Sequence, residues 1–170
     1  MTTARPVAAA IVAALAIGIG AFLAFGGAHS HGTTPPVAYT LLDGTRAHTD
    51  QWRGKVVLVN FWATSCTTCV HEMPQFVRTY EKYKDRGYET VAVAMRYDAP
   101  ANVIQFAQSR RLPFGVAIDI TGSIAASFGP VWLTPTSVLI NKRGEIVKRF
   151  TGEPDFAALQ ALVEKLLAEA

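Results

Sequence analysis

A run of seven residues, Val56 to Trp62, is almost entirely apolar and leads within four residues to a pair of cysteines. Its β-branched residues predict a strand that is covered on both faces. Apolar residues then recur at helical spacing from Val70 to Tyr83, which predicts a helix that ends at Gly87. The two cysteines, Cys66 and Cys69, therefore lie where a buried strand passes into a helix, and the chain is restricted to an α/β fold.

This position favours thiol chemistry at Cys66. The first N–H groups of a helix that begins at Cys66 lack helical partners, and together with the helix dipole they stabilise a thiolate. Residues three apart on a helix have Cβ atoms about 5–6 Å apart, whereas a disulfide needs about 3.5–4.5 Å. A small tightening of the first turn would join Cys66 to Cys69. We therefore predict a pair that cycles between dithiol and disulfide.

Other uses of the cysteine pair fit the sequence less well. A zinc site needs two more ligands, and besides His71 the remaining histidines lie far upstream in polar segments: His29, His31 and His48. Covalent haem attachment needs a histidine directly after the second cysteine, where this chain has Val70. A peroxidatic Cys66 with Thr64 two residues before it stays open as an alternative. We expect no cofactor and no resident metal.

The N-terminal segment differs from the rest of the chain. Residues 7–25 contain no ionisable side chain, and at 1.5 Å per residue they would span about 28 Å, close to the thickness of a bilayer core. Residues 1–28 are therefore predicted to be an uncleaved signal anchor, although Gly26, Gly27 and Ala28 would also suit a signal peptidase. Residues 29–36 read as a flexible linker and 37–170 as one domain. With Arg5 held inside, that domain would lie across the membrane, where disulfides persist.

Composition limits the remaining function classes. The formal net charge of the 170 residues is only +3, and the basic residues are scattered, so no nucleic-acid surface is expected. The rest of the domain alternates strand and helix patterns and ends in an antiparallel hairpin. We predict strands at 37–42, 90–95, 114–118, 136–140 and 146–150, a helix capped by Asp98, a short helix at 121–128, and a last helix opened by Pro154. This order predicts a mixed sheet with helices on both faces.

Several motifs together resemble one family. They are Gly54-Lys55 before the apolar strand, Phe61-Trp62-Ala63, the cysteine pair, Glu72-Met73-Pro74, and Thr134-Pro135-Thr136 leading into Leu139-Ile140-Asn141. Residues 37–168 resemble the membrane-tethered thioredoxin-like proteins of the TlpA/ResA type, which are extracytoplasmic thiol-disulfide oxidoreductases of bacteria. The resemblance implies a thioredoxin-like α/β fold with an N-terminal hairpin and a central β-α insertion within residues 99–118.

The resemblance also implies roles for single residues. Cys66 would attack and Cys69 would resolve, while Pro135 would be a cis-proline beside the disulfide. Trp62 and the Thr134 backbone would bind the substrate. Glu72 lies three residues after Cys69, on the sulfur-bearing side of the helix, so we expect it to exchange a proton with the Cys69 thiol. A solvated surface glutamate is the alternative for Glu72.

The family implies an enzyme that reduces disulfides in exported proteins, such as apocytochrome c or the copper-site cysteines of a respiratory oxidase. Its expected electron donor is a transmembrane thiol reductase, and its expected place is the periplasmic side of the bacterial inner membrane. Ser65 and Thr67-Thr68 depart from the family pattern, which leaves the redox potential open. A copper-handling protein, a disulfide donor and a thiol peroxidase are the alternatives.

Overall fold

A computed structural model describes residues 32–169, and its centre is a five-stranded sheet in the order β5-β4-β3-β6-β7. Neighbours β3–β4 and β4–β5 are parallel, whereas β3–β6 and β6–β7 are antiparallel. The strands are β3 (Val56–Trp62), β4 (Tyr88–Ala94), β5 (Gly115–Ile118), β6 (Thr136–Ile140) and β7 (Ile146–Thr151). The predicted mixed sheet is confirmed, and β3 occupies its centre.

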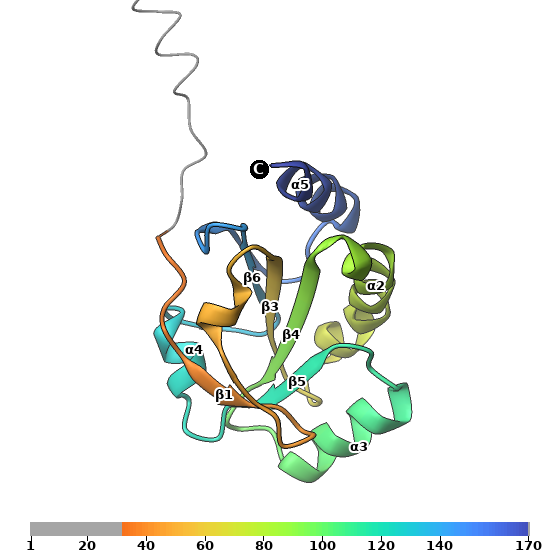
Figure 1. Ribbon diagram of the computed structural model, residues 1–170. Helices are drawn as coiled ribbons and strands as arrows, with labels where there is room; N and C mark the ends of the chain where they lie inside the picture. Colours follow the sequence, from red (N-terminus) through yellow and green to blue (C-terminus); the bar gives the residue numbers. More distant parts are fainter. Residues whose placement is uncertain (1–31, 170) are drawn as a thin grey trace, which may run out of the picture.

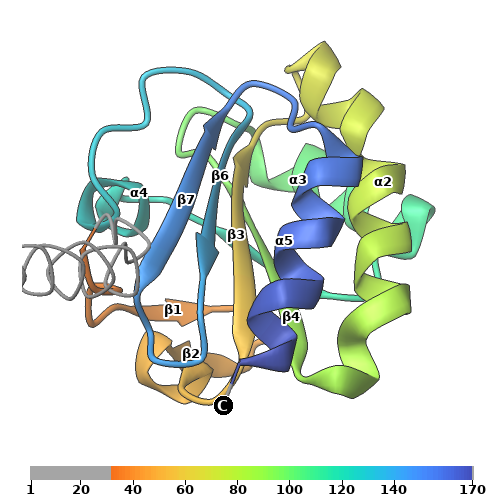
Figure 2. The ribbon, with the colours of Figure 1, turned by 90° about the horizontal axis from the view of Figure 1, so that it is seen from above.

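All seven residues of β3 are buried, because helices cover both faces of the sheet. Side chains alternate between the faces: Val56, Leu58 and Trp62 enter one core, and Val57, Val59 and Phe61 enter the other. The first core is closed by α2 (Thr67–Tyr83), α3 (Pro100–Arg110) and α5 (Phe156–Ala168), and the second by α4 (Ser123–Ser127). Figures 1 and 2 show α2 and α5 side by side, with α4 across the sheet from them.

A short N-terminal hairpin covers part of the second core. Its strands β1 (Ala38–Thr40) and β2 (Arg46–His48) pair antiparallel, and the 3-10 turn η1 (Thr49–Trp52) follows. The Trp52 indole N–H donates to the Tyr39 hydroxyl at 3.0 Å, which satisfies both groups inside this core. The hairpin is the one that the family resemblance implied, although β1 is shorter than the predicted strand at 37–42.

The topology is thioredoxin-like, with an insertion between β4 and α4. The inserted elements are α3 and β5, and β5 extends the sheet as a parallel edge strand beside β4. They fall within the expected range 99–118. The active-site helix α2 ends at Tyr83 and does not continue to Gly87 as predicted. The 3-10 turn η2 (Lys84–Arg86) follows it, and Gly87 closes that turn at φ 88°.

Two predicted helix starts were wrong. Asp98 does not cap α3: Ala99 is the N-cap residue without a side-chain bond, and Pro100 begins the helix. Since proline has no N–H, the first turn has one donor fewer to satisfy, and the Asp98 carboxylate is bonded elsewhere. Pro154 does not open α5 either, because the Asp155 side chain is the cap and accepts from the amides of Ala157 and Ala158.

The predicted anchor at 1–28 and residues 29–31 of the predicted linker lie outside the described residues. The rest of that linker is not a free tether, because the Gly32 carbonyl accepts from the Ile146 amide at 2.8 Å and the Thr34 amide donates to the Gly144 carbonyl at 2.8 Å. Within residues 32–169, no helix combines the length and the apolar character that a membrane crossing requires.

Candidate active site

The cysteine pair lies where the sequence placed it, directly after β3 and at the start of α2. Cys66 is the N-cap residue of α2 and has extended backbone angles, and a disulfide joins it to Cys69 with Cα atoms 5.2 Å apart. The two sulfurs differ in access, because Cys66 is half-buried whereas Cys69 has no exposed surface. A partner molecule can therefore reach Cys66 and not Cys69.

One backbone amide of the helix already points at the sulfur of Cys66. The Cys69 N–H donates to Cys66 Sγ at 3.2 Å, in the geometry of an N-cap side chain. The same donor and the positive end of the helix dipole would stabilise a Cys66 thiolate after reduction. Among the described residues, the hydroxyls of Thr67 and Thr68 make no hydrogen bond to this sulfur, so the amide is the donor that matters.

A loop from the far end of the chain lies against the disulfide. The Thr134–Pro135 peptide bond is cis, and the Thr134 carbonyl oxygen lies 3.5 Å from Cys66 Sγ. Pro135 is buried and Thr134 is half-buried. The Pro135 carbonyl accepts from the Gly152 amide at 2.8 Å, and the Thr134 hydroxyl lies 3.1 Å from the Tyr97 hydroxyl. These bonds hold the loop beside the sulfur that a partner would attack.

Glu72 is not a solvated helix residue, because its side chain is fully buried under α2. Its Oε1 accepts from Asn60 Nδ2 at 3.2 Å, and the same Asn60 nitrogen donates to Ser137 Oγ at 3.0 Å. Glu72 Oε2 and Asn60 Oδ1 have no hydrogen-bond partner. A buried carboxyl group with one oxygen unpartnered is less costly when Glu72 carries a proton and no charge.

Burial raises the pKa of Glu72 from 4.5 to about 8. Desolvation of the charged form is the main cause, the hydrogen bond from Asn60 opposes it, and the negative charge of Glu153 adds to it. A carboxyl group whose pKa lies near neutral can both accept and return a proton. Glu72 is thus a buried carboxyl group with a raised pKa, one helical turn beyond Cys69.

Trp62 does not support its expected role in substrate binding. Its side chain has no exposed surface, and its ring packs against Phe106 with the ring centroids 5.1 Å apart. Position 62 points to the core between the sheet and α3, because alternate residues of β3 face that side. Trp62 therefore belongs to the packing beneath the site.

The sequence missed two side chains that shape the site. Asn60 is the single polar residue of β3, a signal that could have been followed. Asp98, which the sequence suggested as a helix cap, is buried, and its carboxylate accepts from both the backbone amide and the hydroxyl of Thr64. Thr64 lies two residues before Cys66. Asp98 thus anchors the loop that presents the reactive sulfur.

Removal of this anchor should destabilise the fold. Asp98→Ala leaves the amide and the hydroxyl of Thr64 without their acceptor, and we expect a loss of about 1–3 kcal/mol in the free energy of unfolding. Asp98→Asn keeps one acceptor oxygen and should lose less. Urea denaturation of the oxidised proteins measures both, with the exposed Asp85→Ala as control. Equal midpoints for Asp98→Ala and Asp85→Ala would show that Asp98 does not hold the loop.

His71 lies on the surface as expected, and its Nδ1 is 3.6 Å from a carboxylate oxygen of Glu153. Within residues 32–169, no group of three or more histidine, cysteine, aspartate or glutamate side chains is arranged to hold a metal ion.

Comparison with known families agrees with this geometry. The family model described as Redoxin matches residues 30–163. Thiol-disulfide oxidoreductase ResA of Bacillus thuringiensis subsp. konkukian is 35% identical over 132 residues, which cover 78% of this chain and 75% of that protein. Thiol-disulfide oxidoreductase ResA of Halalkalibacterium halodurans is 33% identical over 129 residues, covering 76% of this chain and 72% of that protein.

Solved structures are similar as well. A protein from Neisseria meningitidis described as a thioredoxin aligns with a TM-score of 0.77 and 37% identity, covering 82% of this chain and 92% of the other. A protein from Chlorobium tepidum described as thiol:disulfide interchange protein DsbE aligns with a TM-score of 0.75 and 27% identity, covering 84% of this chain and 100% of the other. Fold, cysteine pair and relatives point to the same chemistry.

Proposed function

The chain belongs to the Redoxin family and is a thioredoxin-fold thiol-disulfide oxidoreductase of the ResA kind, and we propose that it reduces disulfides in exported proteins. The observation that carries this proposal is the asymmetry of the cysteine pair. Cys66 is accessible and receives an amide N–H at 3.2 Å, whereas Cys69 is buried behind it. Such a pair attacks through one sulfur and resolves through the other.

In the proposed reaction, the Cys66 thiolate attacks one sulfur of a partner disulfide, and the other partner sulfur leaves as a thiolate. The Cys69 thiol then loses its proton and attacks Cys66 Sγ, which releases the second partner sulfur as a thiolate. The partner gains two electrons and, after protonation, holds two thiols. The enzyme gives up two electrons and holds the Cys66–Cys69 disulfide.

We assign the proton of Cys69 to Glu72. Water has no access to Cys69, because this residue has no exposed surface, so the proton needs a buried acceptor. Glu72 lies three residues along α2, and its pKa of about 8 lets it take a proton near neutral pH. Asn60 holds the carboxyl group in place through a 3.2 Å bond, which makes it a positioning residue.

The loop at Thr134 and Pro135 is the proposed binding edge for the partner chain. An extended peptide can form main-chain hydrogen bonds with such a loop, which would place its sulfur at Cys66. The 3.5 Å separation between the Thr134 carbonyl oxygen and Cys66 Sγ supports this arrangement. Since Pro135 is buried, we assign it the role of shaping the loop.

We further propose that the domain works outside the cytoplasm, held at the bacterial inner membrane by residues 1–28. The long apolar segment after Arg5 supports the anchor. A reductase in an oxidising compartment needs a supply of electrons, and a transmembrane thiol reductase is the proposed donor. The proposed substrates are cysteine pairs of apocytochrome c or of respiratory oxidase copper sites.

Trapping in the cell envelope tests this proposal. Cys69→Ser cannot resolve the mixed disulfide, so covalent adducts at Cys66 should accumulate, and mass spectrometry should identify exported proteins with cysteine pairs. The double variant Cys66→Ser/Cys69→Ser is the matched control and should give no adduct. In cells that carry the wild-type protein instead, the Cys66–Cys69 pair should be mainly reduced. A mainly oxidised pair would identify a disulfide donor, and absence of Cys66-dependent adducts would exclude catalytic exchange.

A further inference from the structure

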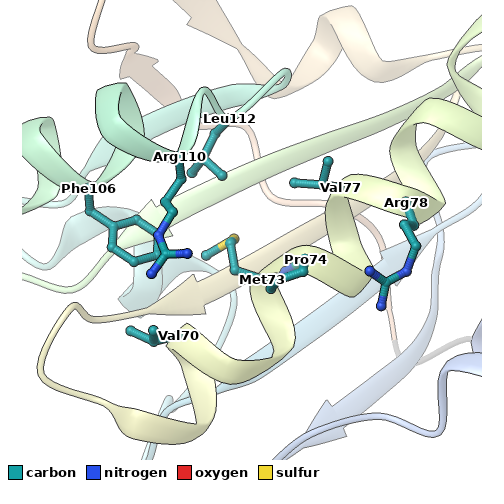
Figure 3. A pocket seen from close by; sticks show the side chains of 8 residues that line it. All are labelled: Val70, Met73, Pro74, Val77, Arg78, Phe106, Arg110 and Leu112. Carbon is teal, nitrogen blue, oxygen red and sulfur yellow. The ribbon is translucent and has the colours of Figure 1, made fainter.

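A groove between the active-site helix α2 and the inserted helix α3 has no role in the function proposed above. Its volume is about 280 Å³. Figure 3 shows Met73 at its centre, with the side chains of Phe106 and Leu112 toward it from the inserted segment. The residues that line it are Val70, Met73, Pro74, Val77, Arg78, Phe106, Arg110 and Leu112. Ligand pockets for small molecules hold about 300–1,000 Å³, so this groove suits one or two side chains better than a cofactor.

Three of the α2 residues that line the groove continue a sequence repeat that begins at Cys66. Cys66, Val70, Met73 and Val77 follow one another at steps of four, three and four residues, which is the repeat of a single helix face. The Val70 amide donates to the Cys66 carbonyl at 3.1 Å, so the stripe is helical from the N-cap onward. A chain bonded to Cys66 can therefore extend directly onto the groove.

The rim of the groove is cationic and lacks a counter-charge. Arg78 and Arg110 are exposed, and the lining includes no acidic residue. Arg78 Nε donates to the uncharged Gln75 at 3.3 Å, and the Arg110 guanidinium lies 5.7 Å from the Phe106 ring centroid. Neither arginine is in an ion pair within the described part of the chain. An apolar floor between two available guanidinium groups is complementary to a bulky apolar side chain with acidic neighbours.

We propose that this groove selects the disulfide partner, by seating an apolar side chain of the partner protein while Arg78 and Arg110 pair with acidic residues beside it. The proposal rests on the disulfide reduction proposed above and adds a specificity-determining surface to it. The partner is thus a polypeptide whose cysteine is followed or preceded by an apolar and acidic segment.

Helix geometry sets the spacing of that segment. Met73 lies seven residues beyond Cys66, which is about 10 Å at 1.5 Å per residue, and Arg78 lies about 18 Å along α2. An extended chain advances about 3.3 Å per residue. The apolar side chain is therefore expected about three residues from the attacked cysteine, and the acidic residues about four to six residues from it.

Model peptides test the selection directly. Each peptide carries one cysteine as its mixed disulfide with thionitrobenzoate, a leucine three residues away and two glutamates beyond the leucine. In one peptide these residues follow the cysteine, and in a second peptide they precede it. Reduced enzyme releases the coloured thiolate when Cys66 attacks the peptide sulfur, and Cys69 then frees the peptide thiol and closes the enzyme disulfide. One sequence has lysines in place of the glutamates, and another has serine in place of leucine.

For the reduced wild-type enzyme, we expect the second-order rate constant of thiolate release to be about tenfold higher for the glutamate peptide than for the lysine peptide in one of the two chain directions. Replacement of leucine by serine should cost a similar factor. High salt should remove the charge preference, because the screening length falls to about 3 Å near 1 M. The double variant Arg78→Glu/Arg110→Glu should cancel or invert that preference.

The double variant Arg46→Glu/Arg86→Glu is the matched control, since it makes the same change of charge at exposed positions outside the groove. It should keep the wild-type preference. If the glutamate and lysine peptides react at equal rates in both chain directions, selection by this groove is overturned. An unchanged preference in Arg78→Glu/Arg110→Glu would overturn it as well. Absence of thiolate release from every peptide would instead contradict the proposed disulfide reduction, so the two failures are distinguishable.

Discussion

Glu72→Gln is expected to flatten the pH dependence of the stability of the oxidised protein. In the wild type, the free energy of unfolding should fall by roughly 3–5 kcal/mol between about pH 4.5 and pH 8. The Glu72 pKa is about 8 in the folded protein, against 4.5 for the ordinary group. Below pH 4.5 both states hold the proton. As the pH rises, the unfolded chain loses the proton first, and this ionisation stabilises it. The folded chain still holds the proton and is not stabilised in this way, so the free energy of unfolding declines until the folded group also ionises.

Urea denaturation at several pH values measures this slope. The glutamine side chain of the variant would still accept from Asn60 but does not titrate, so the decline should disappear and the variant should be the more stable protein near pH 8. Glu81→Gln is the matched control, because Glu81 is an exposed glutamate on the same helix. A slope in Glu72→Gln equal to that of the control and of the wild type would contradict the raised pKa of Glu72.

The strand and helix that carry the cysteines were predictable because their signals are local. A nearly continuous apolar run is sufficient to identify β3, and a regular apolar stripe identifies α2. The N-cap position of Cys66 follows from that junction alone. Whatever depends on a strand–helix boundary and its neighbouring residues could be derived from the sequence.

Other parts of the site depend on pairings over long distances in the chain. Asn60 meets Ser137 because β3 and β6 pair in a register that sets these residues opposite each other. The sequence shows both polar residues but not that register. Asp98 presents the same difficulty, since an aspartate before Pro100 has the local pattern of a helix cap. Its carboxylate instead bonds Thr64, which tertiary packing brings close.

The groove beside α2 also lay beyond local reasoning. Val70, Met73 and Val77 are predicted to be apolar residues of one helix face, and such a face is normally covered completely. The placement of α3 determines how much of it stays open. Phe106 and Leu112 reach Met73 from the inserted segment and leave a space that the helix pattern alone does not reveal.

The two cysteines should differ most sharply in single-serine variants. Cys66→Ser is expected to lower turnover of a disulfide substrate at least about a thousandfold, because the serine hydroxyl stays protonated and forms no disulfide. Cys69→Ser should also stop turning over, but only after one equivalent. Its Cys66 keeps the 3.2 Å bond from the amide of residue 69, which serine retains, so the first attack should proceed at nearly the wild-type rate.

Release of a coloured thiolate from an aromatic disulfide distinguishes these outcomes in one measurement. Reduced wild-type enzyme should release two equivalents, Cys69→Ser one equivalent in a rapid burst, and Cys66→Ser none on the same timescale. The reason is access: Cys69 has no exposed surface and lies behind the half-buried Cys66. A rapid burst from Cys66→Ser would mean that an incoming disulfide reaches Cys69 directly, and the order of attack and resolution derived from burial would be reversed.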